Sequence, residues 1–372
     1  MDEEEERPVL TAVSSSARQL YLLLRCINFS DKVHVQITSS GLKFFVDEAS
    51  VMEGSAFLDK SLFTTYTFHP PPLPVQEQND SDSENELDPP DPNPVFQISL
   101  PSLLETLQIL GLTDPNNNKP PWARDNPSST AFSNNVLGMN NMCRISYTGF
   151  GAPLSIILTE STIRTTCDLT TYEPEFADEI PFDRQSLAFK TIMRGSWLSD
   201  AISELASTSP ERLSLVAKMN KGKPFFALAA SGDLGSASVA FNNNPTSSTR
   251  APPPTHRGAS PDADASTPAN VLETFQLSDP DTPLRCTYKF ALIQKAARAM
   301  SIATKVSVRT DIQGVLSLQF MIETEGAKVS FVDFRFVPLV EDDEGEGDTY
   351  LANDNEEDED ANGVDSATED ES

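Results

Sequence analysis

The sequence has few of the residues that build metal centres and disulfide frameworks. Its 372 residues include four cysteines, with no Cys-x-x-Cys pair, and three isolated histidines, His34, His69 and His256. Cysteines this far apart are typical of buried thiols in a reducing compartment, although Cys143 and Cys167 are near enough in sequence to meet. No spacing of His, Cys or carboxylate residues indicates a metal ligand set. We therefore expect no disulfide, no metal and no cofactor.

Signals for catalysis and for membranes are missing as well. The sequence contains no Gly-rich phosphate-binding loop and no nucleophile with a histidine partner, so we predict no catalytic residue and no enzyme activity. No apolar run approaches the length that spans a bilayer. The first residues are acidic, unlike those of a secretory or mitochondrial leader. These absences predict a soluble intracellular protein with no membrane partner.

Positive charge is scarce, and the excess of negative charge is unevenly placed. The net charge is −29, and residues 341–372, 1–7 and 69–94 carry −16, −4 and −7 of it. The remaining chain carries only −2, so its composition does not exclude a polyanionic partner such as DNA. Two further insertions, 113–140 and 242–270, are rich in Asn, Pro and Ser. All five segments have too few apolar residues to build a core and are predicted to be disordered.

The last apolar stretch, Lys305–Leu339, has a pattern that occurs twice in the chain. Its apolar residues alternate with polar ones in three runs separated by turns at Asp311–Gly314 and Glu325–Gly326. This spacing predicts a three-stranded antiparallel meander. Cys143–Leu169 has the same three runs, and its middle run begins with Gly-Ala-Pro-Leu-Ser where the later one begins with Gly-Val-Leu-Ser. One module is therefore predicted to occur twice.

Amphipathic helices and short strands precede each meander in the same order. The helices are predicted over Ser16–Asn28 and from Pro101 in the first half, and from a cap at Ser196 and over Phe290–Ile302 in the second. Two helices are enough to cover one face of a sheet. The predicted fold class is α+β, with two tandem domains, each a large antiparallel sheet with two helices on one face. These domains span residues 8–169 and 186–340, and an extended connector over 170–185 joins them.

Several motifs resemble those of the DNA sliding-clamp family, proliferating cell nuclear antigen and its relatives. They are Tyr147–Leu154 (YTGFGAPL), Glu173–Glu175 (EPE), Ser231–Gly235 (SGDLG), Lys305–Asp311 (KVSVRTD) and Gly314–Gln319 (GVLSLQ). They occur in both halves at matching spacings, so the resemblance covers about residues 8–340, the insertions apart. Within the family the chain is most similar to one subunit of the checkpoint clamp, the nine-one-one heterotrimer.

The resemblance implies a non-catalytic subunit of a ring that encircles double-stranded DNA at damage sites in the nucleus and recruits checkpoint signalling and repair factors. It also implies two other clamp-like subunits and an ATP-dependent clamp loader as partners. Clamp subunits join through edge strands, which here are Thr162, Ile163, Arg164, Thr165, Thr166, Cys167, Asp168 and Leu169 in the first domain, and Ser236, Ala237, Ser238, Val239, Ala240 and Phe241 in the second. Pairing would remove the hazard of an open edge. The connector residues implied to receive partner peptides are Tyr172, Glu173, Pro174, Glu175 and Phe176.

Four basic residues are candidates for the DNA-facing surface: Arg18, Arg25, Lys295 and Arg298. Each lies opposite the apolar face of a predicted helix, a place where a solvated charge is the ordinary finding. Only the clamp resemblance turns that surface toward DNA. The other two helices carry Glu105, Asp200 and Glu204 outward, so few phosphates would be contacted and the attraction would be weak and salt-sensitive.

Two other functions are open at this point. The acidic tail would suit a histone-chaperone-like protein that binds basic partners, although such a tail also simply repels and solubilises. The abundance of Asp and Glu would suit a metal-dependent 3′–5′ exonuclease, which needs carboxylates clustered by the fold. The densest clusters lie in segments predicted to be disordered, which cannot preorganise a metal.

Overall fold

The structure is a computed structural model, and it describes residues 7–71, 93–109, 142–160, 163–175, 179–242, 271–324 and 328–340. The five segments expected to be disordered lie almost wholly outside these residues, so their disorder stays a prediction. Contacts group Met1–Leu339 into one compact unit. The other unit, Val340–Ser372, contributes only Val340 to the described residues.

The described strands divide evenly between the two halves of the chain. The first half contains β1 (Leu10–Ser14), β2 (Lys32–Thr38), β3 (Gly41–Glu48), β4 (Met52–Asp59), β5 (Thr65–Phe68), β6 (Val95–Ser99), β7 (Met142–Tyr147), β8 (Leu154–Glu160) and β9 (Ile163–Leu169). The second half contains β10 (Leu187–Arg194), β11 (Arg212–Asn220), β12 (Lys223–Gly232), β13 (Gly235–Asn242), β14 (Thr274–Leu277), β15 (Leu284–Lys289), β16 (Lys305–Asp311), β17 (Leu316–Thr324) and β18 (Lys328–Phe336).

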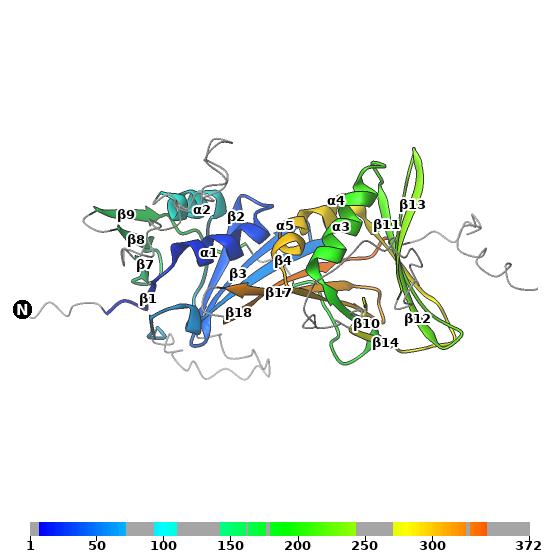
Figure 1. The fold of residues 1–372 in the computed structure, drawn as a ribbon. Helices are drawn as coiled ribbons and strands as arrows, with labels where there is room; N and C mark the ends of the chain where they lie inside the picture. Colours follow the sequence, from blue (N-terminus) through cyan, green and yellow to red (C-terminus); the bar gives the residue numbers. More distant parts are fainter. Residues whose placement is uncertain are drawn as a thin grey trace, which may run out of the picture. The chain divides into compact units, whose positions relative to one another are not determined.

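The helices are also shared by the two halves. They are α1 (Ala17–Leu24), the 3₁₀ turns η1 (Arg25–Ile27) and η2 (Lys60–Leu62), and α2 (Leu100–Gln108), followed by α3 (Gly195–Ala206), α4 (Phe290–Lys295) and α5 (Ala297–Ile302). Helix α1 packs against α2, α3 against α5, and α5 against η1. The α-helices gather on one side of the sheets (Figure 1). The last contact, between α5 and η1, joins the helices of the two halves.

The strands form three antiparallel sheets whose order shows the duplication directly. The orders are β5-β1-β7-β8-β9, then β14-β10-β16-β17-β18-β4-β3-β2-β6, and finally β13-β12-β11-β15. The series β5-β1-β7-β8-β9 repeats as β14-β10-β16-β17-β18, and β4-β3-β2-β6 repeats as β13-β12-β11-β15. Strand β18 of the second half pairs with β4 of the first, which merges two of these four units into one nine-stranded sheet (Figure 1).

This arrangement refines the predicted architecture. Large antiparallel sheets with helices on one side are present, but each half divides its strands between two sheets, and the nine-stranded sheet belongs to both halves. Strongly twisted sheets rarely exceed about ten strands, and the sheets here have five, nine and four. The two meanders are β7-β8-β9 and β16-β17-β18, as the period-two pattern predicts.

Two helix predictions need correction. Helix α3 begins at Gly195 with Arg194 as its N-cap, not at a Ser196 cap. A Cβ at Gly195 would lie 2.4 Å from the carbonyl oxygen of Ala303, so glycine lets the first turn approach α5 closely. The predicted helix Phe290–Ile302 is divided at Ala296, whose backbone (φ −83°, ψ −1°) leaves regular helical geometry.

Two strands were not predicted at all. Strand β1 has the alternating burial of a half-buried strand but only five residues, and it lies directly before α1. Strand β14 has four residues and follows an insertion. Both depend on pairing with distant strands, β1 with β7 and β14 with β10, so local pattern carries little sign of them.

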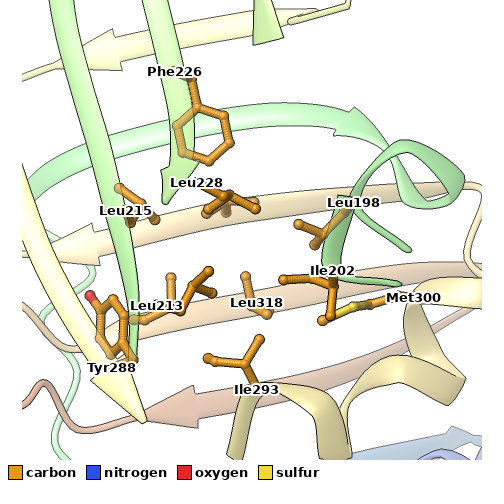
Figure 2. Close-up of a pocket in the computed structure, with 12 residues that line it drawn as sticks. Leu198, Ile202, Leu213, Leu215, Phe226, Leu228, Tyr288, Ile293, Met300 and Leu318 are labelled. Carbon is orange, nitrogen blue, oxygen red and sulfur yellow. The ribbon is translucent and has the colours of Figure 1, made fainter. Parts of the chain in front are cut away.

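The core of the second half contains a small void between the helices and the sheets. It measures about 20 Å³, and its lining includes Leu198 and Ile202 of α3, Leu213 of β11, and Leu318 of β17 (Figure 2). Tyr288 also lines the void, but its hydroxyl group donates to the carbonyl of Gly314 at 2.7 Å. A void of this size with an apolar lining offers a water no hydrogen-bond partners, so it is a packing defect and not a ligand site.

None of the described helices is long and apolar enough to cross a membrane.

Candidate functional site

The sheet edges differ in how well they are protected. The edge of β6 is closed by the connector, because Gln97 and Tyr172 exchange backbone hydrogen bonds of 2.9 and 2.8 Å. The outer side of β15 accepts a hydrogen bond from Leu339 to Thr287 at 2.7 Å. Edge strands β5 and β14 have four residues each, and short edges are one way to avoid unwanted pairing. That leaves β9 and β13, of seven and eight residues, for which the described part of the chain provides no outer neighbour.

The joint between β18 and β4 shows what such an edge looks like when it is paired. By the repeated sheet order, β18 is the counterpart of β9 and β4 is the counterpart of β13. In the joint, Phe334 lies opposite Gly54, and Val332 lies opposite Ala56. Val332, Phe334 and Ala56 are fully buried there. The chain therefore contains one paired example of the two kinds of edge that β9 and β13 represent.

The corresponding positions on the free edges are only partly covered. On β9, Thr165, Cys167 and Leu169 face the core side and are half-buried. On β13, Ala237 and Val239 are half-buried in the same way. The remaining members of each edge have other environments: Arg164, Thr166, Asp168, Ser236, Ser238 and Ala240 are exposed, and Phe241 is buried. Thr162 lies outside the described residues, as does the side chain of Ile163. A neighbouring strand at either edge would complete the burial of its core-facing row.

The first part of the connector is held against β2. The ammonium group of Lys32 lies 2.7 Å from the Glu175 carboxylate and 5.7 Å from the ring centre of Tyr172. The Lys32 hydrogen bond lowers the pKa of Glu175. Nε2 of His34 lies 2.9 Å from the Glu175 carbonyl oxygen. Tyr172 and Glu173 are exposed.

Pro174 is half-buried, and Phe176 lies outside the described residues. Of the connector residues named from the resemblance, Glu175 already forms an ion pair within the chain, with Lys32.

The second part of the connector is anchored at Ile180, whose side chain is 3% exposed. Its N–H donates to Glu53 at 3.2 Å, and its carbonyl accepts from Arg335 at 2.7 Å. Glu53 and Arg335 face each other across the β4–β18 joint and form an ion pair of 3.6 Å. Burial raises the pKa of the Glu53 carboxyl, and the charge of Arg335 opposes that rise. The Glu53–Arg335 pair therefore contacts both the joint and the connector.

A polar cavity of about 230 Å³ lies next to this anchor. It is lined by Lys43, Glu53, Ser55, Phe57, Phe182, Arg184, Ser317, Asp333 and Arg335. The sequence predictions did not include these residues as a site, because they followed the apolar face of each strand and not the outward face. The signal that could have found them is the row Asp333, Arg335 on β18 and Glu53 on β4, charged residues at alternate positions of otherwise apolar strands.

The four candidate DNA-facing residues all belong to the helices, but they are not equally available. Arg25 is exposed, with its guanidinium 5.7 Å from the ring centre of Tyr21, and Arg18 is half-buried on α1. Lys295 forms a 2.5 Å ion pair with Glu48 at the end of β3. Arg298 is half-buried, and its Nε is enclosed without a hydrogen-bond partner. The sequence therefore placed these residues on helices correctly but did not reveal that Lys295 is engaged.

The structure brings Arg25 and Arg298 together around Cys26. Burial raises the pKa of the Cys26 thiol to about 12, and the positive charges of Arg298 and Arg25 act against the rise. Arg25 belongs to the first half and Arg298 to the second, so the junction of the halves concentrates positive charge. The exposed acids Glu105, Asp200 and Glu204 lie elsewhere, on α2 and α3.

Comparison with known proteins decides the family. The model of the family described as "Repair protein Rad1/Rec1/Rad17" matches residues 9–322. The chain belongs to this family. It is 31% identical over 325 residues to the DNA damage checkpoint control protein rad1 of Schizosaccharomyces pombe, covering 87% of this chain and 84% of that protein. It is 27% identical over 346 residues to the cell cycle checkpoint protein RAD1 of Homo sapiens, covering 93% and 97%. The membership expected from the sequence motifs is confirmed.

The fold is confirmed by a solved structure. Proliferating cell nuclear antigen from Thermococcus kodakaraensis superposes with a TM-score of 0.55 at 15% identity, covering 89% of this chain and 100% of that one. The α+β clamp architecture predicted from the sequence is therefore correct. A more distant partial relative, 27% identical over 48% of this chain, is named "DNA repair exonuclease REC1" in Mycosarcoma maydis. In the described part of the chain, no three His, Cys, Asp or Glu residues are grouped so as to hold a metal ion.

Proposed function

We propose that this member of the Rad1 family is one subunit of a heterotrimeric ring that encircles double-stranded DNA at damage sites in the nucleus. The ring recruits checkpoint signalling and repair factors, and this subunit performs no chemistry itself. The observation that carries the proposal is the β18–β4 joint, which reproduces within the chain the contact that β9 and β13 need. An open edge of seven or eight residues is a liability unless a neighbour pairs with it.

Two unlike neighbours are favoured by the chemistry of the two edges. The outward row of β9 carries Arg164 and Asp168, while the outward row of β13 carries Ser236, Ser238 and Ala240, which are small and uncharged. Because β13 offers no counter-charge to Arg164 or Asp168, other clamp-like subunits are favoured over further copies of this chain as neighbours. Placing such a closed ring on DNA requires it to be opened, which is the work of an ATP-dependent loader in this proposal.

The DNA is proposed to contact the helix side. The exposed Arg25 and the half-buried Arg18 and Arg298 are the candidate charges there, whereas Lys295 would have to leave Glu48 to reach a phosphate. So few cations give weak, salt-sensitive attraction. A closed ring stays on DNA because it encircles the duplex, so it does not need a stronger electrostatic attraction.

Partner peptides are proposed to approach the connector and the polar cavity beside it. Tyr172 is 48% exposed, and the cavity offers the cations of Lys43, Arg184 and Arg335 next to the aromatic ring of Phe182. This combination supplies both apolar and polar contacts to a bound segment. No observation on the described residues favours the histone-chaperone or exonuclease alternatives.

The experiment that tests the proposed ring is retention on circular DNA. The chain is co-expressed with the two clamp-like checkpoint subunits of its own host, and the purified complex is loaded onto a nicked circular plasmid with the matching loader and ATP. Retention at high salt on the circle, with release after the plasmid is cut once, is the expected result. Equal retention on circular and linear DNA would contradict encirclement.

A further inference from the structure

The β18–β4 joint can be aligned with the proposed joints at the β9 and β13 edges, and the alignment shows which residues would meet there. The β8–β9 ladder ends at the pair Leu154 and Leu169, and the β17–β18 ladder ends at the equivalent pair Leu316 and Phe336. Counting back one residue from Leu169 and from Phe336 makes Asp168 the counterpart of Arg335.

The other side of the joint is aligned in the same way. The β2–β3 hairpin closes at Thr38 and Gly41, and the β11–β12 hairpin closes at Asn220 and Lys223. Two residues beyond each turn, Lys43 pairs with Phe57 and Phe225 pairs with Asn242. Counting back four residues from Phe57 and from Asn242 makes Ser238 the counterpart of Glu53. A β9 edge paired like the internal joint would therefore set Asp168 opposite the residue that its neighbour has at the Glu53 position.

The internal pair shows what this position demands. Arg335 lies directly opposite Glu53, and the two charges are 3.6 Å apart. The Glu53 side chain is only 7% exposed, because the β18 strand and the connector residue Ile180 both lie against it. A charge that loses its water without gaining a counter-charge is destabilising, and a complementary one is tolerated or favourable.

The free edges do not satisfy this demand with each other. Asp168 has the opposite sign to Arg335, its internal counterpart, and Ser238 carries no charge where Glu53 carries one. In the described part of the chain, the Asp168 carboxylate accepts a hydrogen bond from the hydroxyl of Ser155 at 2.5 Å. A second copy of this chain would therefore cover Asp168 without neutralising it.

We infer that β9 selects a clamp-fold neighbour that carries lysine or arginine opposite Asp168, and that this requirement disfavours a second copy of the chain. The inference rests on the proposed ring, and it names the chemistry of one neighbour. Electrostatic complementarity of this kind gives specificity more than affinity, because a wrong partner leaves a charge unpaired.

The first test uses a second copy of the chain as the probe. Ser238→Lys supplies the missing base to the chain's own β13 edge, and Ser238→Glu is the matched control with a side chain of similar length and opposite charge. We expect the lysine variant to self-associate about two- to fivefold more tightly than the parent in sedimentation equilibrium at low salt, as one partly exposed ion pair allows. Adding Asp168→Lys to it should remove the gain. Equal association of the lysine and glutamate variants would overturn the inference.

The second test separates the inference from the ring itself. In the co-expressed complex, Leu169→Glu buries a charge on the core-facing row, and Asp168→Lys changes only the outward charge. The inference predicts that both reduce the yield of complex, and that Asp168→Asn reduces it less than Asp168→Lys. Loss with Leu169→Glu but full assembly with Asp168→Lys would reject the charge requirement and keep the ring. Full assembly with both would reject the β9 joint altogether.

Discussion

Glu53 and Arg335 lie opposite each other where the two halves of the chain meet, and together they hold both polar groups of one connector residue, Ile180. The carboxylate accepts the Ile180 N–H and the guanidinium donates to the Ile180 carbonyl. The same two side chains line the polar cavity. The seam between the halves and the connector are therefore coupled through Arg335, which also lies 3.7 Å from the Glu179 carboxylate of the connector.

Removing the cation of this pair should destabilise the protein. Arg335→Met leaves the Glu53 carboxylate buried without its counter-charge and deprives Ile180 of a donor, so we expect a loss of about 1–3 kcal/mol in the free energy of unfolding. Arg212→Met, at an exposed arginine of β11, is the control and should change stability by less than about 0.5 kcal/mol. Urea unfolding measures both. Equal effects of the two substitutions would show that the pair does not hold the seam.

The pH dependence of stability should report the raised pKa of Glu53. Because burial raises this pKa above its ordinary value of 4.5, the folded state favours the protonated carboxyl. The stabilising contribution of Glu53 is present in full at pH values below its ordinary pKa. It is lost as the pH rises through the raised pKa of the folded state. The stability of the parent should therefore fall relative to that of Glu53→Gln as the pH rises above 4.5.

Glu179 provides the matched comparison, since its pKa is lowered by its hydrogen bond to Lys43. The sign is reversed there. The stabilising contribution of Glu179 is present at pH values above its ordinary pKa and disappears as the pH falls through the lowered pKa. The stability of the parent should therefore rise relative to that of Glu179→Gln as the pH rises. Paired denaturation curves measured on both sides of pH 4.5 give both differences. Two differences of the same sign would contradict the assigned environments.

Much of this arrangement follows from sequence pattern, and the remainder depends on long-range pairing. The two meanders, their Gly-bearing turns and the internal repeat were evident from alternation alone, because β17 and β18 each bury one face. Strands β1 and β14 were missed, because four or five residues give too short a pattern and their partners are far away in sequence. Lys295 was placed on an exposed helix face, yet it meets Glu48 from the other half, a contact that no local rule contains.

The Lys295–Glu48 ion pair should contribute modestly to the contact between the halves. Both side chains keep about a third of their exposure, so the pair is screened by water, and we expect Lys295→Gln to cost at most about 1 kcal/mol. Lys295→Glu should cost more, because it sets two carboxylates against each other. Thermal unfolding of the two variants beside Lys289→Gln and Lys289→Glu, made at an exposed lysine of β15, measures the difference. Identical stability of Lys295→Gln and Lys295→Glu would mean that Glu48 does not sense this position.

The helix surface should contribute to DNA association through Arg18 and Arg25. Reversing Arg18 and Arg25 to Glu should weaken binding of the assembled ring to linear duplex DNA, equally for any sequence, since phosphate contacts carry no base information. The deficit should shrink as salt rises, because screening already removes part of the attraction. Lys190 and Arg212, on the outward side of β10 and β11, provide the control pair for the same reversal. Equal binding by both double variants would leave Arg18 and Arg25 as ordinary surface.

The central claim is that β9 is a joining edge, and the mass of the assembled complex tests it most directly. Leu169→Glu places a charge on the core-facing row of β9, and Thr67→Glu places the same charge on β5, the opposite edge of the same sheet. Each variant is co-expressed with the two clamp-like subunits, and the mass of the product is measured by light scattering after size-exclusion chromatography. The account predicts a three-subunit mass with Thr67→Glu and loss of that species with Leu169→Glu, although the isolated Leu169→Glu chain still unfolds cooperatively. A three-subunit mass with both variants would contradict it.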